Sequence, residues 1–128
     1  GLAWWEQARD EAGEVTWIRH DIEPGRSQFH DIQLADIDGD GKDELVTGKR
    51  WRAHMGNDPG ADDPLGVYWF DLEEAKLDRH TIDYGPAGEA SGVGIYFWVA
   101  DVDANGHNDI VAPGKEGLFL FKNMGETK

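Results

Sequence analysis

Hydrophobic residues lie in short runs along the chain, and most of these runs are rich in β-branched and aromatic residues. Residues 29–35 and 95–100 are two such runs, and each ends at a turn signal, a pattern that predicts strands. Shorter strands are predicted at 45–47 and 110–112, and others at 1–6, 17–22, 66–71, 77–82 and 117–122. Two polar stretches, 6–12 and 71–76, have helical propensity but are too short to carry a core, so we expect them to connect strands.

These runs recur in a fixed order. Residues 36–46 read D-I-D-G-D-G-K-D-E-L-V, and residues 101–111, 65 positions later, read D-V-D-A-N-G-H-N-D-I-V. A glycine-aromatic run occurs at 1–6, 66–71 and 117–122, and an Arg-His run occurs at 19–22 and 79–82. The order predicts a repeat of roughly 60–65 residues that is present about twice.

Four short antiparallel strands per repeat, separated by Gly and Asp, are typical of a β-propeller blade. We therefore expect an all-β fold with about two four-stranded antiparallel blades. Residues 1–22 would form an outer half-blade, 29–82 a complete blade and 95–128 an inner half-blade. A propeller needs about four to eight blades, so the segment is expected to be part of a longer propeller or to assemble with other copies into a ring.

The acidic stretches have the spacing of a calcium loop. Oxygen-bearing side chains occupy positions 1, 3, 5 and 9, a glycine at position 6 permits a sharp turn, and position 7 can offer its carbonyl. Ca²⁺ takes about six to eight oxygen ligands, which this spacing can supply. The predicted ligands are Asp36, Asp38, Asp40, Lys42 and Glu44 in the first loop, and Asp101, Asp103, Asn105, His107 and Asp109 in the second. The first loop has four carboxylates and the second three, which favours tighter binding at the first if the geometry is equal.

The acidic stretches have two other interpretations. An EF-hand would need flanking helices and a Glu at position 12, but Thr47 and Ala112 stand there and the flanks are strand-like. A solvated turn is the simpler alternative, because Asp and Gly are common turn residues. Two copies in register, each between predicted strands, favour a structural Ca²⁺ that offsets repulsion among the carboxylates.

With these elements in place, the chain resembles a known family. Residues 36–46 and 101–111, each leading into a short strand and a glycine-aromatic run, are similar to the FG-GAP/VCBS repeats of calcium-binding β-propellers, which integrin α-subunit heads and many bacterial surface proteins contain. Glu44 departs from the Asp that is usual at its position. Residues 48–54 and 58–60 are also similar to stretches of propellers of the aldos-2-ulose dehydratase type, which act on keto-sugar derivatives.

The first repeat contains an insertion, at residues 49–64. It gathers positive charge and one Trp in a chain that is otherwise acidic, so it is a candidate site for a sugar or a sugar acid. Lys49 and His54 are candidates for catalysis, and the candidate ligand-binding residues are Lys49, Arg50, Trp51, Arg52 and His54. The alternative is that these cations pair with the abundant Asp and Glu while Trp51 packs on the blade.

Composition narrows the range of partners. The chain has 12 Lys and Arg against 26 Asp and Glu, a formal charge of −14, which disfavours nucleic acid and anionic membranes. It has no cysteine and no apolar run long enough to span a membrane, and we expect a secreted, periplasmic or cell-surface protein.

The sequence thus predicts a calcium-stabilised propeller module that binds carbohydrate or protein. The alternative, which the second resemblance implies, is part of a lyase or isomerase acting on a sugar derivative. The sequence contains no nucleotide fingerprint or catalytic triad.

Overall fold

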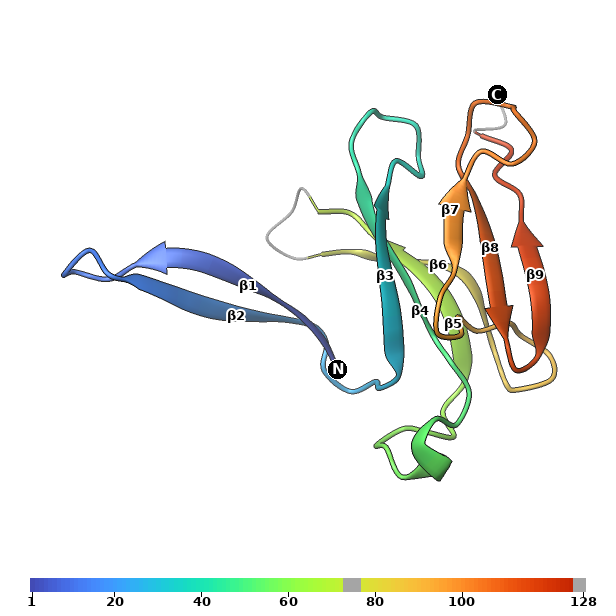
Figure 1. Cartoon of the computed structure of the whole chain (residues 1–128), viewed down its shortest axis with the longest axis horizontal. Helices are drawn as coiled ribbons and strands as arrows, with labels where there is room; N and C mark the ends of the chain where they lie inside the picture. Colours follow the sequence, from blue (N-terminus) through green and yellow to red (C-terminus); the bar gives the residue numbers. More distant parts are fainter. Residues whose placement is uncertain (73–76, 126–128) are drawn as a thin grey trace.

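The structure is a computed structural model, and it describes residues 1–72 and 77–125 (Figure 1). Within these ranges the regular structure is almost entirely strand, with a single 3₁₀ turn at His54–Gly56 and no helix able to cross a membrane. The strands are β1 (Leu2–Arg9), β2 (Val15–Glu23), β3 (Phe29–Ala35), β4 (Glu44–Lys49), β5 (Leu65–Phe70), β6 (Arg79–Gly85), β7 (Trp98–Ala100), β8 (Asp109–Gly114) and β9 (Gly117–Phe121).

The strands form three antiparallel sheets. β1 and β2 make a hairpin, β3 to β6 make a four-stranded sheet in sequence order, and β7 to β9 make a three-stranded sheet. The all-β prediction is therefore confirmed. The four-stranded sheet lies within residues 29–85, and the three-stranded sheet lies within residues 98–121.

Two segments differ from the sequence prediction. Residues 6–9, expected in a connection, continue strand β1, and the turn begins only at Asp10, whose Oδ1 accepts hydrogen bonds from the N–H groups of Ala12 and Glu14, both at 2.9 Å. The cross-strand partners of residues 6–9 on β2 outweigh their helical propensity. The other expected connection, 71–76, lies largely outside the described residues.

The strand predicted at 95–100 begins only at Trp98. Side chains of β3 take the place of strand partners for the backbone before and within β7. Asp31 Oδ2 accepts from the N–H of Phe97 at 3.1 Å, and Gln33 bonds both the carbonyl of Phe97 and, at 3.1 Å, the N–H of Val99. The two larger sheets are thus joined through β3 and β7, which lie side by side in Figure 1.

The larger hydrophobic core lies between these two sheets. It contains buried residues from β4, β5, β8 and the segment before β7, namely Val46, Val67, Val93, Phe97, Ile110 and Ala112. A side chain at Gly48 would meet Val93 Cγ2 and the carbonyl oxygen of Gly66 at 2.5 Å, so glycine lets residue 93 pack directly against the sheet.

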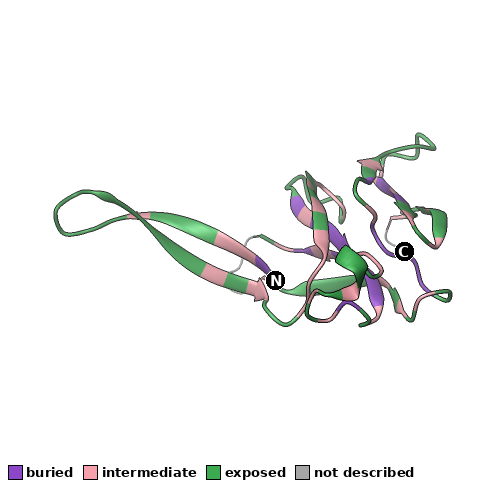
Figure 2. Ribbon diagram, turned by 60° about the horizontal axis from the view of Figure 1, so that its bottom comes forward, coloured by how far each residue is buried: buried purple, intermediate pink, exposed green. Residues whose placement is uncertain are grey.

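A second, smaller core lies on the opposite face of the four-stranded sheet. Leu2, at the base of the hairpin, packs against Tyr68 and Phe70 of β5. Figure 2 shows the contrast along the hairpin: burial is confined to its base, and most of the arm beyond is exposed or half-buried. The base of the hairpin is therefore held by the body of the molecule while the arm projects from it (Figure 1).

Candidate metal centre

The two acidic loops occupy equivalent places in the fold. The first connects β3 to β4 and the second connects β7 to β8, and both lie at the same end of the molecule (Figure 1). In each case the loop follows a strand that borders the other sheet, β3 or β7. The strand after the loop, β4 or β8, contributes residues to the core. The repeat seen in the sequence is therefore also a repeat of position.

In the first loop, side chains fold the backbone around a point. Asp36 accepts hydrogen bonds from the N–H groups of Gly39 at 2.6 Å and Gly41 at 3.0 Å. Gly41 has a φ of 90°, which a residue with a side chain rarely adopts. The carboxylates of Asp36, Asp38 and Asp40 each place an oxygen within 4.8 Å of the others.

The second loop repeats this arrangement atom for atom at several points. Asp101 Oδ2 accepts from the N–H of Gly106 at 2.9 Å, and Gly106 has a φ of 91°. Asn105 Oδ1 accepts from the N–H of His107 at 2.8 Å, as Asp40 Oδ1 does from Lys42 at 2.9 Å. The convergent carboxylates here are Asp101, Asp103 and Asp109.

The ninth position differs between the loops. Glu44 and Asp109 are both buried, and both accept a hydrogen bond from the second residue of their loop, Ile37 at 2.7 Å and Val102 at 3.1 Å. Asp109 also reaches the carboxylate cluster, whereas Glu44 is not among the three clustered acids of the first loop. Three carboxylates converge in each loop, so the advantage of the first loop expected from counting acids is absent from this geometry.

Burial and neighbouring charge act on these acids. Burial raises the pKa of Glu44, and the negative charges of Asp38 and Asp36 raise it further against the lowering effect of the Ile37 hydrogen bond. In the second loop Lys122 Nζ lies 2.5 Å from Asp103 Oδ2, and this hydrogen bond lowers the pKa of Asp103. Lys42 Nζ lies 3.5 Å from Asp40 Oδ2 in the first loop. In each loop, one of the clustered acids is therefore already paired with a lysine ammonium.

Asparagines join the two loops, and the sequence analysis missed them. Asn108 Nδ2 donates to the carbonyl of Asp36 at 2.8 Å, and Asn123 Nδ2 donates to the carbonyl of Ile37 at 2.7 Å. Asn123 also bonds the second loop, because its N–H donates to Asp109 Oδ1 at 2.8 Å and its carbonyl accepts from Asn105 Nδ2 at 2.9 Å. Nothing in the sequence marks Asn123, which follows the last strand far from the first loop.

A cavity of about 350 Å³ opens beside the loops, between the two larger sheets. Its walls are mainly apolar, and Asp38, Asn108, Lys122 and Asn123 add polar groups to its lining. Its apolar residues are Ile37, Trp69, Ile82, Ile110 and Phe121.

The insertion at 49–64 lies beyond the other ends of β4 and β5, away from the acidic loops (Figure 1). Lys49 is fully buried, and its ammonium donates to the carbonyl of Asp63 at 3.1 Å and more distantly to that of Arg50. Burial lowers the pKa of Lys49. This candidate residue is therefore enclosed by the insertion and is not presented to solvent.

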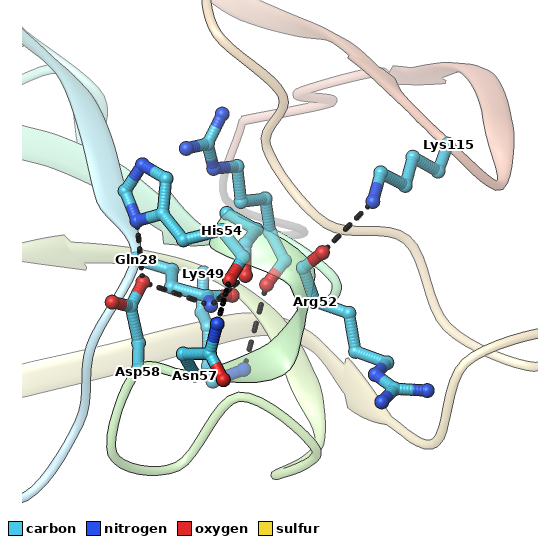
Figure 3. A network of polar contacts seen from close by, with 9 residues as sticks. Gln28, Lys49, Arg52, His54, Asn57, Asp58 and Lys115 are labelled. Atoms are coloured by element: carbon cyan, nitrogen blue, oxygen red, sulfur yellow. Dashed lines mark hydrogen bonds and ion pairs between the residues drawn. The ribbon is translucent and has the colours of Figure 1, made fainter.

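The remaining candidates of the insertion divide into two groups. Arg52 pairs with Asp62 at 3.0 Å. His54 Nδ1 lies 2.9 Å from Asp58 Oδ2, which also accepts from Gln28 (Figure 3). These contacts support the alternative in which the cations of the insertion pair with its acids. Arg50 and Trp51 are half-buried, and Arg50 Nε is buried without a hydrogen-bond partner in the described part of the chain.

Comparison of the chain with models of protein families, with curated proteins and with solved structures finds no match.

Proposed function

We propose that this chain is a calcium-stabilised module of β-propeller blades, of the FG-GAP/VCBS kind, that serves as a binding scaffold. The observation that carries the proposal is the double occurrence of one loop structure. Two loops 65 residues apart share the carboxylate-to-backbone bonds, the left-handed glycine and the buried acid at position nine.

The donor set of each loop fits a hard divalent cation. Carboxylate oxygens within 4.8 Å of one another can share one ion, and without it they repel each other. Carboxylate and carbonyl oxygens are the ligands that Ca²⁺ prefers, and the carbonyls of Lys42 and His107 are the predicted backbone donors. The ion would fix the connection between two strands in each sheet.

The blade interpretation is supported by the pairing of equivalent residues. Trp4 pairs with His20 in the hairpin, and Trp69 pairs with His80 in the four-stranded sheet, although 15 residues separate the first pair in the sequence and ten the second. Leu2 packs on the four-stranded sheet, and Val67, its equivalent in the next glycine-aromatic run, is in the core formed with the three-stranded sheet. The same strand positions thus make the same contacts with the following sheet.

The proposal is tested by thermal unfolding with and without the ion. The chain is expected to melt at a higher temperature in millimolar Ca²⁺ than in a chelator, because an ion that binds the folded state stabilises it by mass action. Asp38→Asn and Asp103→Asn should each remove part of this difference, and the double variant should remove most of it. Glu11→Gln at the hairpin tip is the matched control, since it removes one exposed acid far from both loops.

Equal melting temperatures in chelator and in Ca²⁺ would disprove the structural-calcium proposal. Mg²⁺ provides a further comparison, because it prefers octahedral sites that retain water. Stabilisation that Mg²⁺ reproduces fully would indicate a general charge effect on the acidic loops.

The binding role of the scaffold is assigned to the exposed part of the insertion. His54 Nδ1 lies 2.9 Å from Asp58 Oδ2 at its surface, and Lys115 Nζ donates to the carbonyl of Arg52 at 2.9 Å (Figure 3). A glycan array that includes sugar acids tests this assignment, with Arg52→Ala and His54→Ala as variants. No signal above background would leave the paired acids and bases with a packing role only.

A further inference from the structure

The N-terminal hairpin has large apolar side chains in solvent. Trp5 is 56% exposed and Trp17 is 55% exposed, and Val15 and Ile18 are also exposed. A two-stranded hairpin is marginally stable in water unless a further element covers it. Tryptophan side chains are costly to leave in water, so this arm has the composition of a contact surface.

The alternation of side chains assigns these residues to two faces of the hairpin. Leu2, Trp4 and, across the strands, His20 lie on the face that packs toward the four-stranded sheet at its base. Trp5 is on the opposite face. Its partner on β2 is Arg19, and Trp17, two positions before Arg19, shares that face. This second face is called the outer hairpin face below. Its apolar residues are Ala3, Trp5, Val15 and Trp17, and Gln7, Arg9, Arg19 and Asp21 share it.

The three-stranded sheet also has an uncovered face. Its inner face contributes Ile110 and Phe121 to the main core. On its outer face Trp98, Val111 and Leu120 form one row across the three strands, and Leu118 lies beside them. Trp98 is 73% exposed, Leu118 72% and Leu120 51%, so this outer sheet face is apolar and open to solvent among the described residues.

The repeat shows what such a face does elsewhere in the same chain. Val46 corresponds to Val111, and Val67 corresponds to Leu118. Val46 and Val67 are fully buried, because the three-stranded sheet packs on them through residues that include Phe121. The outer sheet face is therefore the counterpart of a face that the molecule already buries.

The repeat also shows what kind of residue covers that face. Phe121 occupies the fifth position of its glycine-aromatic run, and the residue in that position of the first run is Trp5. Trp5 is thus the positional equivalent of a residue that packs against the core cluster containing Val46 and Val67, yet it is 56% exposed among the described residues.

We propose that two copies of this chain associate head to tail, the outer hairpin face of one copy packing on the outer sheet face of the next. Trp5 and Trp17 of one copy would cover Leu118 and Leu120 of the other. The two faces are different surfaces, so the contact is heterologous, and repeated contacts generate a closed ring or an open filament. The proposal rests on the repeat equivalence used above for the proposed function, and not on the calcium ion.

The first test is the mass of the full chain by size-exclusion chromatography with light scattering, in Ca²⁺ buffer over a hundredfold range of concentration. The expected result is a species above 14.3 kDa whose share rises with concentration. Trp5→Glu and Leu120→Glu should each lower the mass to that of one chain, because each buries a charge in the contact. Met55→Glu, at an exposed residue of the insertion, is the control and should leave the assembly unchanged.

The decisive test mixes the two variants. Trp5→Glu retains an intact sheet face and Leu120→Glu retains an intact hairpin face, so an equimolar mixture should form a dimer that cannot grow further. Trp98→Glu serves as a second sheet-face variant, and circular dichroism confirms that each variant folds. A wild-type chain of one-chain mass at all concentrations would overturn the proposal, as would a mixture that stays at that mass.

Self-association of Leu120→Glu alone would also overturn it, because that result indicates contact between two hairpins. The melting experiment with chelator separates this inference from the proposed function. If the wild-type chain is stabilised by Ca²⁺ but does not assemble, only the contact is refuted. If it assembles but is not stabilised by Ca²⁺, only the ion is refuted.

Discussion

The rings of Trp69 and His80 stack at a centroid distance of 3.7 Å, with their planes 6° from parallel. Trp4 and His20 stack in the same way at 4.2 Å and 12°. Each pair joins a glycine-aromatic strand to the following Arg-His strand. The stack therefore links the same two strands in both repeats, which gives His20 and His80 a packing role at equivalent positions.

Replacing His80 by Ala should lower the free energy of unfolding by about 1 kcal/mol, because stacked aromatic pairs contribute roughly 0.5–1.5 kcal/mol beyond their buried area. His80→Phe is the control, since it keeps a planar ring against Trp69 and should retain most of the stability. Urea unfolding measures both variants. Equal destabilisation by Ala and Phe would indicate that the imidazole nitrogens, and not the stack, are what the strand needs.

Asn123 is predicted to couple the two acidic loops. Asn123→Ala removes the donor to the Ile37 carbonyl and the acceptor for the N–H of Gly125, and should cost about 1–3 kcal/mol, since a carbonyl loses its partner. Asn57→Ala is the matched control, because it deletes one exposed bond to the His54 carbonyl and should cost little. Chemical unfolding compares them, and similar losses would show that the bridge adds no stability.

Lys122 is predicted to compete with a metal ion at the second loop. Its ammonium lies against Asp103, one of the three clustered acids, so a cation that binds there must displace it. Lys122→Met should tighten calcium binding at this loop by a few-fold, because surface ion pairs are individually weak. Calorimetric titration of wild type and variant measures the change. Unchanged affinity at both loops would show that Lys122 and the ion do not share Asp103.

The sequence predicts features that depend on local pattern and misses those that depend on distant partners. The turns at Gly41 and Gly106 follow from residue spacing, because glycine adopts a φ near 90° without the steric cost that a side chain adds. The late start of β7 does not, since it arises from Asp31 and Gln33 of β3 bonding the backbone of residues 97 and 99. Strand propensity contains no information on such bonds between sheets.

The same limit applies to the candidate sites. Lys49 is in a basic run that indicates an exposed binding loop, but it is also the last residue of β4. The strand holds its side chain beneath the insertion, where the Lys49 ammonium donates a hydrogen bond to the carbonyl of Asp63. Spacing predicts the convergence of Asp101, Asp103 and Asp109, but it also predicts Glu44 as a ligand of the first loop, where the three clustered acids are Asp36, Asp38 and Asp40.

The buried ammonium of Lys49 should make stability depend on pH in the alkaline range. Burial lowers the pKa of Lys49 in the folded chain, while the unfolded chain keeps the ordinary value of 10.5. Between these two values the unfolded state binds more protons than the folded state, so the free energy of unfolding rises as the pH rises. Lys49→Met removes the titrating group and with it this contribution.

The measurement is urea unfolding of wild type and Lys49→Met at intervals from pH 7 to 9.5, below the range in which Tyr68 ionises, since burial raises the pKa of Tyr68 above 10.0. The stability of wild type relative to Lys49→Met should increase as the pH rises through the lowered pKa of Lys49, because the folded wild-type chain then sheds a buried charge. Lys49→Arg is the control, as a guanidinium stays charged throughout and cannot recover stability in this way. A difference between wild type and Lys49→Met that is constant across the range would show that the Lys49 ammonium is hydrated in the folded chain.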